Sequence, residues 1–137
     1  MMERSRSSAD IIGQLQRQLR EHDDMLTTLR GLDRAIDWIA PTLAGTWVNF
    51  GGSEDTAAYS RTSSGIVLLK GVIKSGTVPS TALTLPVGFR PLKIMRFACV
   101  SNALFAAASV DTNGVVTPYA GSNVSFSLAN ISFRAEQ

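Results

Sequence analysis

The stretch Gly65–Thr77, GIVLLKGVIKSGT, carries the strongest structural signal in the sequence. Aliphatic and β-branched residues crowd both sides of Gly71, and Ser75-Gly76-Thr77 follows as a turn signal. A glycine inside a strand pattern marks a bulge or a bend, because it has no side chain to pack. We therefore expect a β-strand over residues 66–74 that bends at Gly71.

Short apolar runs separated by turn residues continue on both sides of this stretch. They predict strands over residues 46–50, 57–61, 83–85, 94–100, 105–110, 115–119 and 124–128, with a last apolar pair at Ile131 and Phe133. Asp111-Thr112-Asn113-Gly114 is a hairpin connection in which Asn113 and Gly114 tolerate positive φ. About eight short strands at roughly ten-residue spacing indicate a mainly β head over residues 41–137, an antiparallel, jelly-roll-like β-sandwich.

Residues 1–40 have a different character. They hold six of the 13 basic and seven of the 11 acidic residues. Ser7 and Ser8 can cap a helix that has Asp10 in its first turn, and Pro41 stops the helix near Ile39. The chain therefore divides at Pro41 into an N-terminal helix and the β head.

Apolar residues in the helix follow a heptad pattern with one change of register. The seam consists of Ile12, Leu15, Leu19, His22, Leu26, Leu29, Leu32, Ile36 and Ile39. A narrow stripe on an otherwise polar helix favours a self-associating coiled coil over a helix packed on a globular core. His22 is either a polar layer that fixes the register, or an axial site for an anion or water that weakens as the imidazoles become charged in acid.

Composition narrows the function further. Only 18% of the residues are charged, below the roughly 25% of typical soluble domains, so part of the surface is expected to be covered by other copies of the chain. The single Cys and single His exclude an intramolecular disulfide and Cys- or His-rich metal sites. Cys99, within the apolar run 97–100, is expected to be a buried small hydrophobe rather than a reactive thiol.

The expected partners do not include nucleic acid or a membrane. The chain has no run of Lys and Arg interleaved with aromatic residues, and no apolar stretch of the roughly 18 residues that a membrane span needs. The polar N-terminus does not resemble a signal peptide.

Catalysis is not expected, and no cofactor or metal is implied. The head contains four acids, of which Glu54 and Asp55 are adjacent and Asp111 lies in a turn, whereas a glycosidase needs two carboxylates that face each other. His22 lies on the helix, far in sequence from any Ser of the head, so a serine hydrolase lacks its base.

Several segments of the head resemble, in the same order, the C-terminal heads of tailed-bacteriophage receptor-binding and tail-fibre proteins. They are Gly65–Thr77, Leu83–Pro91 and Asn130–Glu136, preceded by Trp47–Gly52 and Tyr59–Arg61. The resemblance covers residues 45–136. It implies a homotrimer with a β-sandwich head on a coiled-coil stalk, located in the virion beside other tail or baseplate proteins, that adsorbs to host cell-surface saccharide.

The short region before the head departs from that family, whose members carry a long N-terminal docking region. The alternatives are a main receptor binder, a structural fibre or adaptor without a ligand and, less favoured, a cell-wall glycan hydrolase. Saccharide sites pair an aromatic platform with polar groups. The resulting ligand-binding candidates, each with a competing packing role, are Trp47, Tyr59, Tyr119, Asn113 and Asn123. Arg90 and Arg96 are expected to brace a loop or a subunit interface.

Overall fold

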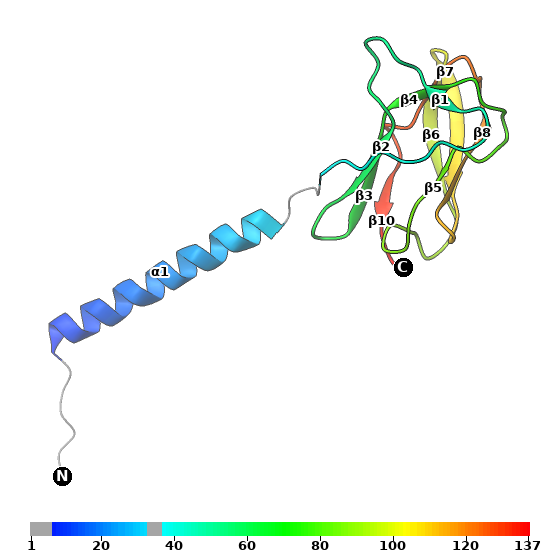
Figure 1. The fold of residues 1–137 in the computed structure, drawn as a ribbon. Coiled ribbons are helices and arrows are strands. Elements are labelled where there is room, and N and C mark those ends of the chain that lie inside the picture. Colours follow the sequence, from blue (N-terminus) through cyan, green and yellow to red (C-terminus); the bar gives the residue numbers. More distant parts are fainter. Residues whose placement is uncertain (1–6, 33–36) are drawn as a thin grey trace. The chain divides into compact units, whose positions relative to one another are not determined.

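The computed structural model describes residues 7–32 and 37–137 and divides the chain into two compact units, Met1–Arg34 and Ala35–Gln137 (Figure 1). We call them the helical unit and the β unit. The helical unit contains α1 (Ser8–Leu32). The strands of the β unit are β1 (Val48–Asn49), β2 (Ala58–Arg61), β3 (Ile66–Lys70), β4 (Val72–Lys74), β5 (Leu83–Thr84), β6 (Met95–Ser101), β7 (Leu104–Val110), β8 (Val115–Ala120), β9 (Phe126–Ser127) and β10 (Ser132–Arg134).

Helix α1 begins where the capping signal predicted. The Ser7 hydroxyl oxygen accepts a hydrogen bond from the Asp10 backbone N–H at 3.2 Å, which satisfies one of the free amides of the first turn. The Asp10 carboxylate lies in that turn, where its charge is favourable against the helix dipole. The helix has 25 residues.

The prediction that the helix runs on to Ile39 is wrong. Ile39 forms an antiparallel bridge with Tyr59, in which Ile39 N donates to Tyr59 O at 2.8 Å and Tyr59 N donates to Ile39 O at 3.0 Å. Because this bridge satisfies both backbone groups of Ile39, the residue belongs to the β unit and not to a helical seam. The division of the chain accordingly lies before Ala35 rather than at Pro41. Ile36 lies outside the described residues.

Gly71 separates β3 from β4, as predicted. Its φ is 103°, and a Cβ at this position would lie 2.4 Å from the Ala57 backbone nitrogen. The change of direction sends the two halves of the stretch into different sheets, because β3 pairs with β2 and β10 whereas β4 pairs with β1 and β9. Gly71 therefore supplies both the backbone conformation and the close approach that this corner needs.

The described strands form three sheets, and every pairing among them is antiparallel. Their orders are β1-β4-β9, β10-β3-β2 and β5-β8-β7-β6. The longest pairing joins β6 to β7, from Met95 opposite Val110 to Ser101 opposite Leu104. The expectation of a mainly β chain with antiparallel sheets and one helix is confirmed.

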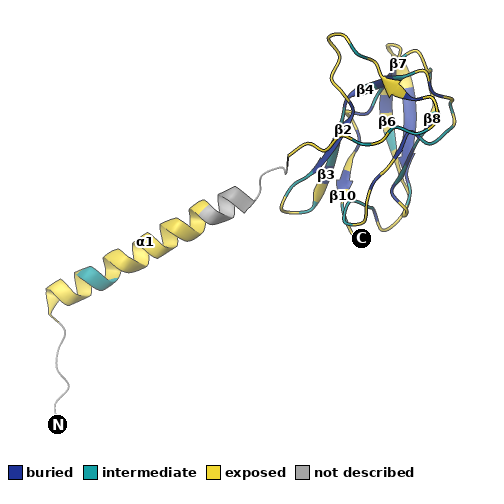
Figure 2. Cartoon of the chain, in the orientation of Figure 1, coloured by how far each residue is buried: buried dark blue, intermediate teal, exposed yellow. Residues whose placement is uncertain are grey.

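One hydrophobic core receives residues from all three sheets. Val67 from β3, Ile73 from β4, Phe126 from β9, and Val110 and Val116 from β7 and β8 are fully buried members of the same cluster. Figure 2 shows the buried segments gathered in the strands of the β unit. Burial of one such side chain contributes about 1.5–3 kcal/mol in favour of the folded state.

Two hairpin turns differ in how far the sequence predicted them. Asp111 Oδ1 accepts hydrogen bonds from Asn113 N at 2.9 Å and Val115 N at 3.0 Å, which confirms its expected role in the β7–β8 turn, where Gly114 has a φ of 79°. The predicted strands 94–100 and 105–110 leave the turn that connects β6 to β7 unspecified. Its central residues, Asn102 and Ala103, have φ values of 49° and 63°, a conformation that alanine rarely adopts.

Candidate functional site

The predicted seam gives α1 a stripe of exposed apolar side chains. Ile12, Leu15, Leu19 and Leu26 are all exposed, with Leu19 retaining 64% of its accessible surface. Figure 2 shows the described part of α1 exposed along almost its whole length. The side chains of Leu29 and Leu32 lie outside the described part. A row of large aliphatic side chains in water is unfavourable, so this face is a candidate surface for self-association.

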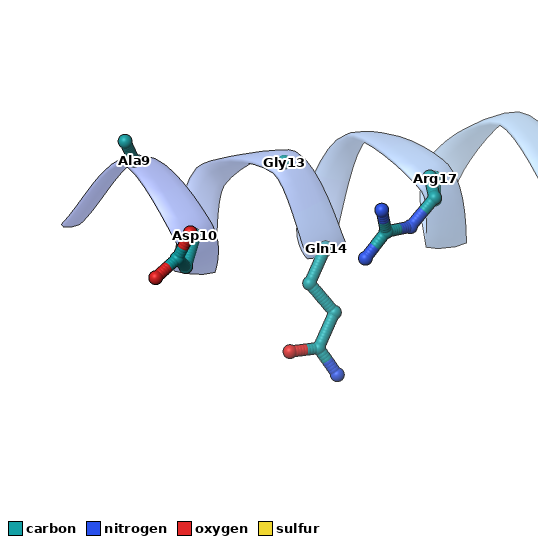
Figure 3. Close-up of a pocket in the computed structure, with 5 residues that line it drawn as sticks. All are labelled: Ala9, Asp10, Gly13, Gln14 and Arg17. Atoms are coloured by element: carbon teal, nitrogen blue, oxygen red, sulfur yellow. The ribbon is translucent and has the colours of Figure 1, made fainter. Parts of the chain in front are cut away.

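A hollow on α1 lies on the other side of the helix from this stripe. Figure 3 shows the five residues that line it, which all come from the first turns of α1: Ala9, Asp10, Gly13, Gln14 and Arg17. In the heptad numbering that places Ile12 at position a, these residues occupy positions b, c, e and f. No second element of the described chain encloses the hollow, so it offers a ligand only one wall.

Trp47 is a core residue, which corrects its interpretation as an aromatic platform. It retains 2% of its accessible surface and packs edge-on against Phe126, with ring centroids 6.3 Å apart. Its indole Nε1 donates to Ser80 Oγ at 3.2 Å. Gly76 lies against its ring, so that a Cβ there would be 1.9 Å from Trp47 Cδ2. No face of the ring is left for a sugar.

The two candidate asparagines have different environments. Asn123 Nδ2 donates to Gly76 O at 2.9 Å, and Asn123 O accepts from Ser75 N at 2.9 Å, so this residue ties its loop to the end of β4. Asn113 is exposed in the β7–β8 turn, and only its backbone N–H has a hydrogen bond among the described residues. Asn123 therefore has a structural role in holding its loop, whereas the side chain of Asn113 is exposed to solvent.

Tyr119 on β8 is partly covered by Arg96 on β6. The guanidinium carbon of Arg96 lies 4.9 Å from the centre of the Tyr119 ring, a cation–π distance. This contact spans the sheet across β7 and involves neither the Pro-rich loop nor a second subunit, so the expected bracing role of Arg96 stays a prediction. One face of the Tyr119 ring is thus already engaged.

Tyr59 borders an open cleft of about 540 Å³ within the β unit. The residues that line it are Ala40, Pro41, Thr42, Ala44, Tyr59, Thr84, Leu85, Pro86 and Arg90. The Tyr59 ring stands edge-on to Phe89 with centroids 5.2 Å apart, and most of the ring is buried. Of the five ligand-binding candidates, only Tyr59 lines this cleft, so the structure does not gather the candidates into one site.

Arg90 is a cleft residue that sequence reasoning placed only as a brace. It does brace the Pro-rich loop, because its Nε donates to Leu85 O at 2.9 Å. The cleft itself brings residues 40–44 beside residues 84–90, a proximity that no local sequence signal indicates. The backbone bond Ala44 N to Ala82 O, 2.7 Å long, holds the first of these segments in place.

The β6–β7 hairpin presents a second exposed apolar surface. Val100 and Phe105 stand opposite each other on the two strands and both are exposed, Phe105 by 76%. Leu104, next to Phe105 and opposite Ser101, is exposed as well. Val100 and Phe105 share one face at the end of the hairpin, and we refer to these two residues as the hairpin patch; Leu104, the neighbour of Phe105 along β7, points to the opposite face.

The acidic residues of the β unit have structural partners or lie apart. Asp55 Oδ1 forms an ion pair with Lys70 Nζ at 3.1 Å, and Asp111 is bonded to turn amides. Among residues 7–32 and 37–137, no three His, Cys, Asp or Glu residues gather in a metal-binding arrangement.

The expectation for Cys99 is confirmed, since the residue is buried. Burial raises the pKa of its thiol to about 11, against the opposing effect of a backbone hydrogen bond at Ala108.

Within residues 7–32 and 37–137, no helix has both the length and the hydropathy that crossing a bilayer requires.

Comparison with known proteins gives a likeness at the level of the fold. No protein-family model matches the chain, and no curated protein sequence matches it. Among solved structures, the receptor-binding protein gp15 of Listeria phage PSA is similar, with a TM-score of 0.71 and 14% sequence identity over 97% of this chain and 82% of that chain. The chain therefore has the fold of a phage receptor-binding protein.

Proposed function

We propose that this chain is a receptor-binding protein of a tailed bacteriophage, a homotrimer that attaches the virion to saccharide on the host cell surface. The observation that carries the proposal is the fold shared with the gp15 receptor-binding protein. The ordered segments of the head that resemble phage receptor-binding proteins point the same way. Because one fold can serve several functions, binding to cells needs a direct test.

Two exposed apolar surfaces support the homotrimer. The stripe on α1 fits a coiled-coil stalk, and the hairpin patch fits a contact between sandwich-like heads. In this proposal other tail or baseplate proteins hold the assembly in the virion.

Binding without cleavage is part of the proposal. The pairing of Asp55 with Lys70 supports it, since that carboxylate is engaged in a surface ion pair rather than facing Glu54 across a cleft. Release of reducing sugar from bacterial wall material is expected to stay at background. Release that Glu54→Gln or Asp55→Asn abolishes would contradict this part.

The direct test is labelling of intact cells. The fluorescently tagged full chain is expected to label particular strains in a panel of bacteria that includes Listeria, and free wall saccharide is expected to compete. Tagged protein with Leu19→Asp, which carries a charge within the stripe on α1, is the control for multivalency, because a monomer should label the same strains more weakly. The proposal fails if the protein labels no strain and binds no immobilised wall glycan.

A structural fibre or adaptor without a ligand is a second candidate, and one observation favours it. The aromatic residues expected to form a sugar platform are buried, as Trp47 is, or partly covered, as Tyr119 is by Arg96. This candidate predicts a trimer that assembles into particles but labels no cells. The labelling experiment therefore separates the two functions.

A further inference from the structure

The cleft beside Tyr59 has the size and the polar groups of a ligand site. Its volume of about 540 Å³ lies within the roughly 300–1,000 Å³ range of small-molecule pockets. The segment 40–44 forms one wall, and Thr84, Leu85, Pro86 and Arg90 form the other. Both walls belong to the β unit, whose core fixes their positions.

Arg90 is held in place by one of its nitrogens while the others stay accessible. Nε donates to Leu85 O at 2.9 Å, and the side chain passes over Gly114, where a Cβ would lie 3.0 Å from Nε and 3.1 Å from Cγ. Within the described chain, Nη1 and Nη2 have no hydrogen-bond or ion-pair partner, and neither atom is buried. The guanidinium is therefore positioned in advance, with its terminal donors open to a ligand.

Hydroxyl groups from both walls accompany this guanidinium. Thr42 and Thr84 are exposed at the cleft. The hydroxyl of Tyr59 makes no hydrogen bond to any described residue, although most of its ring is buried, and the oxygen is not enclosed. A site with one cation and several free hydroxyls suits a ligand that carries many hydroxyls and one acidic group.

The charge of the residues that line the cleft indicates that the ionic group of the ligand is negative. None of the nine lining residues is acidic, and Arg90 is the one that is charged. Glu136 lines a different hollow, with Lys93 and Arg134. An arginine with free terminal donors forms paired hydrogen bonds to a carboxylate or a phosphate, which are stronger than bonds between neutral groups.

We propose that this cleft binds a sugar unit bearing a phosphate or a carboxylate, with Arg90 on the acidic group and the hydroxyls of Tyr59 and Thr84 on the sugar. The inference rests on the proposed function, because it names the receptor chemistry and the place where the receptor binds. It also makes Arg90 a specificity residue in addition to a brace.

The test titrates three sugars into the full chain: glucose 1-phosphate, glucuronic acid and glucose. At low salt the protein is expected to bind at least one of the acidic sugars at least tenfold more tightly than glucose, and the two acidic arms identify which group is preferred. Equal binding of all three, or binding of none, would overturn the inference.

Variants then assign the binding to the cleft. Arg90→Gln is expected to lower affinity for the preferred acidic sugar at least tenfold, to the level of glucose. Arg96→Gln, which removes the same charge at Tyr119, is the matched control and is expected to leave binding unchanged. Equal losses in both variants would show a general charge effect and overturn the assignment.

A second variant protects the test against a folding defect in Arg90→Gln. Tyr59→Phe removes only a hydroxyl that no described residue bonds, so the melting temperature is expected to stay unchanged. Binding of the acidic sugar is expected to weaken about threefold. Unchanged binding in Tyr59→Phe, together with unchanged binding in Arg90→Gln, would exclude the cleft.

The two proposals can fail separately. If the wild-type protein labels cells and Arg90→Gln labels them equally well, the receptor binds elsewhere, so the cleft inference fails while the proposed function stands. If the wild-type protein labels no cells but binds an acidic sugar with loss in Arg90→Gln, the cleft is a saccharide site and receptor binding fails.

Discussion

The two units of this chain treat their apolar residues in opposite ways. The β unit buries Ile73, Phe126 and Val116 completely inside one core, whereas α1 leaves Leu15 and Leu19 exposed. The β unit therefore has a core of its own, although its hairpin patch stays exposed, whereas the described part of α1 leaves its apolar stripe uncovered. The difference teaches where each effect should appear: substitutions in the core of the β unit should change its folding stability, whereas substitutions on the stripe of α1 should change the proposed association.

The largest effect is expected from the core of the β unit. Phe126→Ala removes a fully buried ring that packs edge-on against Trp47, and it should lower the free energy of unfolding by about 3–5 kcal/mol. Urea denaturation followed by tryptophan fluorescence measures the loss. Val87→Ala, at an exposed loop position, is the control and should change stability by less than about 0.5 kcal/mol. Equal effects would mean that the core does not carry the stability of the unit.

The next effect concerns the helix. Leu19→Asp places a charge on the exposed stripe and should weaken association by about 3 kcal/mol per chain, so that the protein becomes monomeric at micromolar concentration. Sedimentation velocity measures association, and urea denaturation of the β unit should be unchanged. Thr27→Asp adds the same charge off the seam and should leave association intact. A loss in both variants would reject the seam as the contact.

A smaller effect is expected at the corner between β3 and β4. Gly71→Ala forces an L side chain into a φ of 103° and against the Ala57 backbone, at a cost of about 2 kcal/mol. Thermal unfolding of the variant measures this loss. Gly13→Ala, where a Cβ meets no other atom and the backbone is helical, should leave the β unit unaffected. A wild-type melting temperature for Gly71→Ala would refute the close approach.

The smallest effect depends on pH. The pKa of the Cys99 thiol is about 11 in the folded chain against an ordinary 9.0, so between these values the folded state holds a proton that the unfolded state has released. The stabilisation is present below pH 9 and is lost as the pH rises through 11. The wild type should lose about 1–2 kcal/mol relative to Cys99→Ala by about pH 10.5. The free energy of unfolding of both proteins is measured by urea denaturation between pH 8 and about pH 10.5. If it changes with pH equally in wild type and Cys99→Ala, burial does not raise the pKa of the thiol.

Local signals allowed much of the β unit to be predicted, because glycines and turn residues act over a few positions. The bend at Gly71 follows from such a signal, and so do the hydrogen bonds that backbone N–H groups of the β7–β8 turn donate to the Asp111 carboxylate. Ile39 was misassigned because its spacing continues the heptad pattern, while the partner that holds it extended, Tyr59, is distant in sequence. The Asn102–Ala103 turn does not follow from the sequence, because alanine gives no sign of positive φ.

The candidate site was harder to predict than the fold, for a related reason. An aromatic residue in a strand pattern looks the same whether it faces a ligand or a core. Trp47 is buried by Gly76 and Phe126, which are far from it in sequence. The cleft that contains Arg90 likewise depends on two segments brought together by the fold. Residue type indicated the chemistry, but only tertiary contacts placed it.

The mass of the assembly that the full chain forms in solution tests the account most directly, because it shows whether other copies of the chain cover the exposed stripe of α1. Light scattering at micromolar concentration should give three times the chain mass of 14.7 kDa. A mass of one chain would contradict the trimer and, with it, the proposed route by which the exposed stripe of α1 is buried.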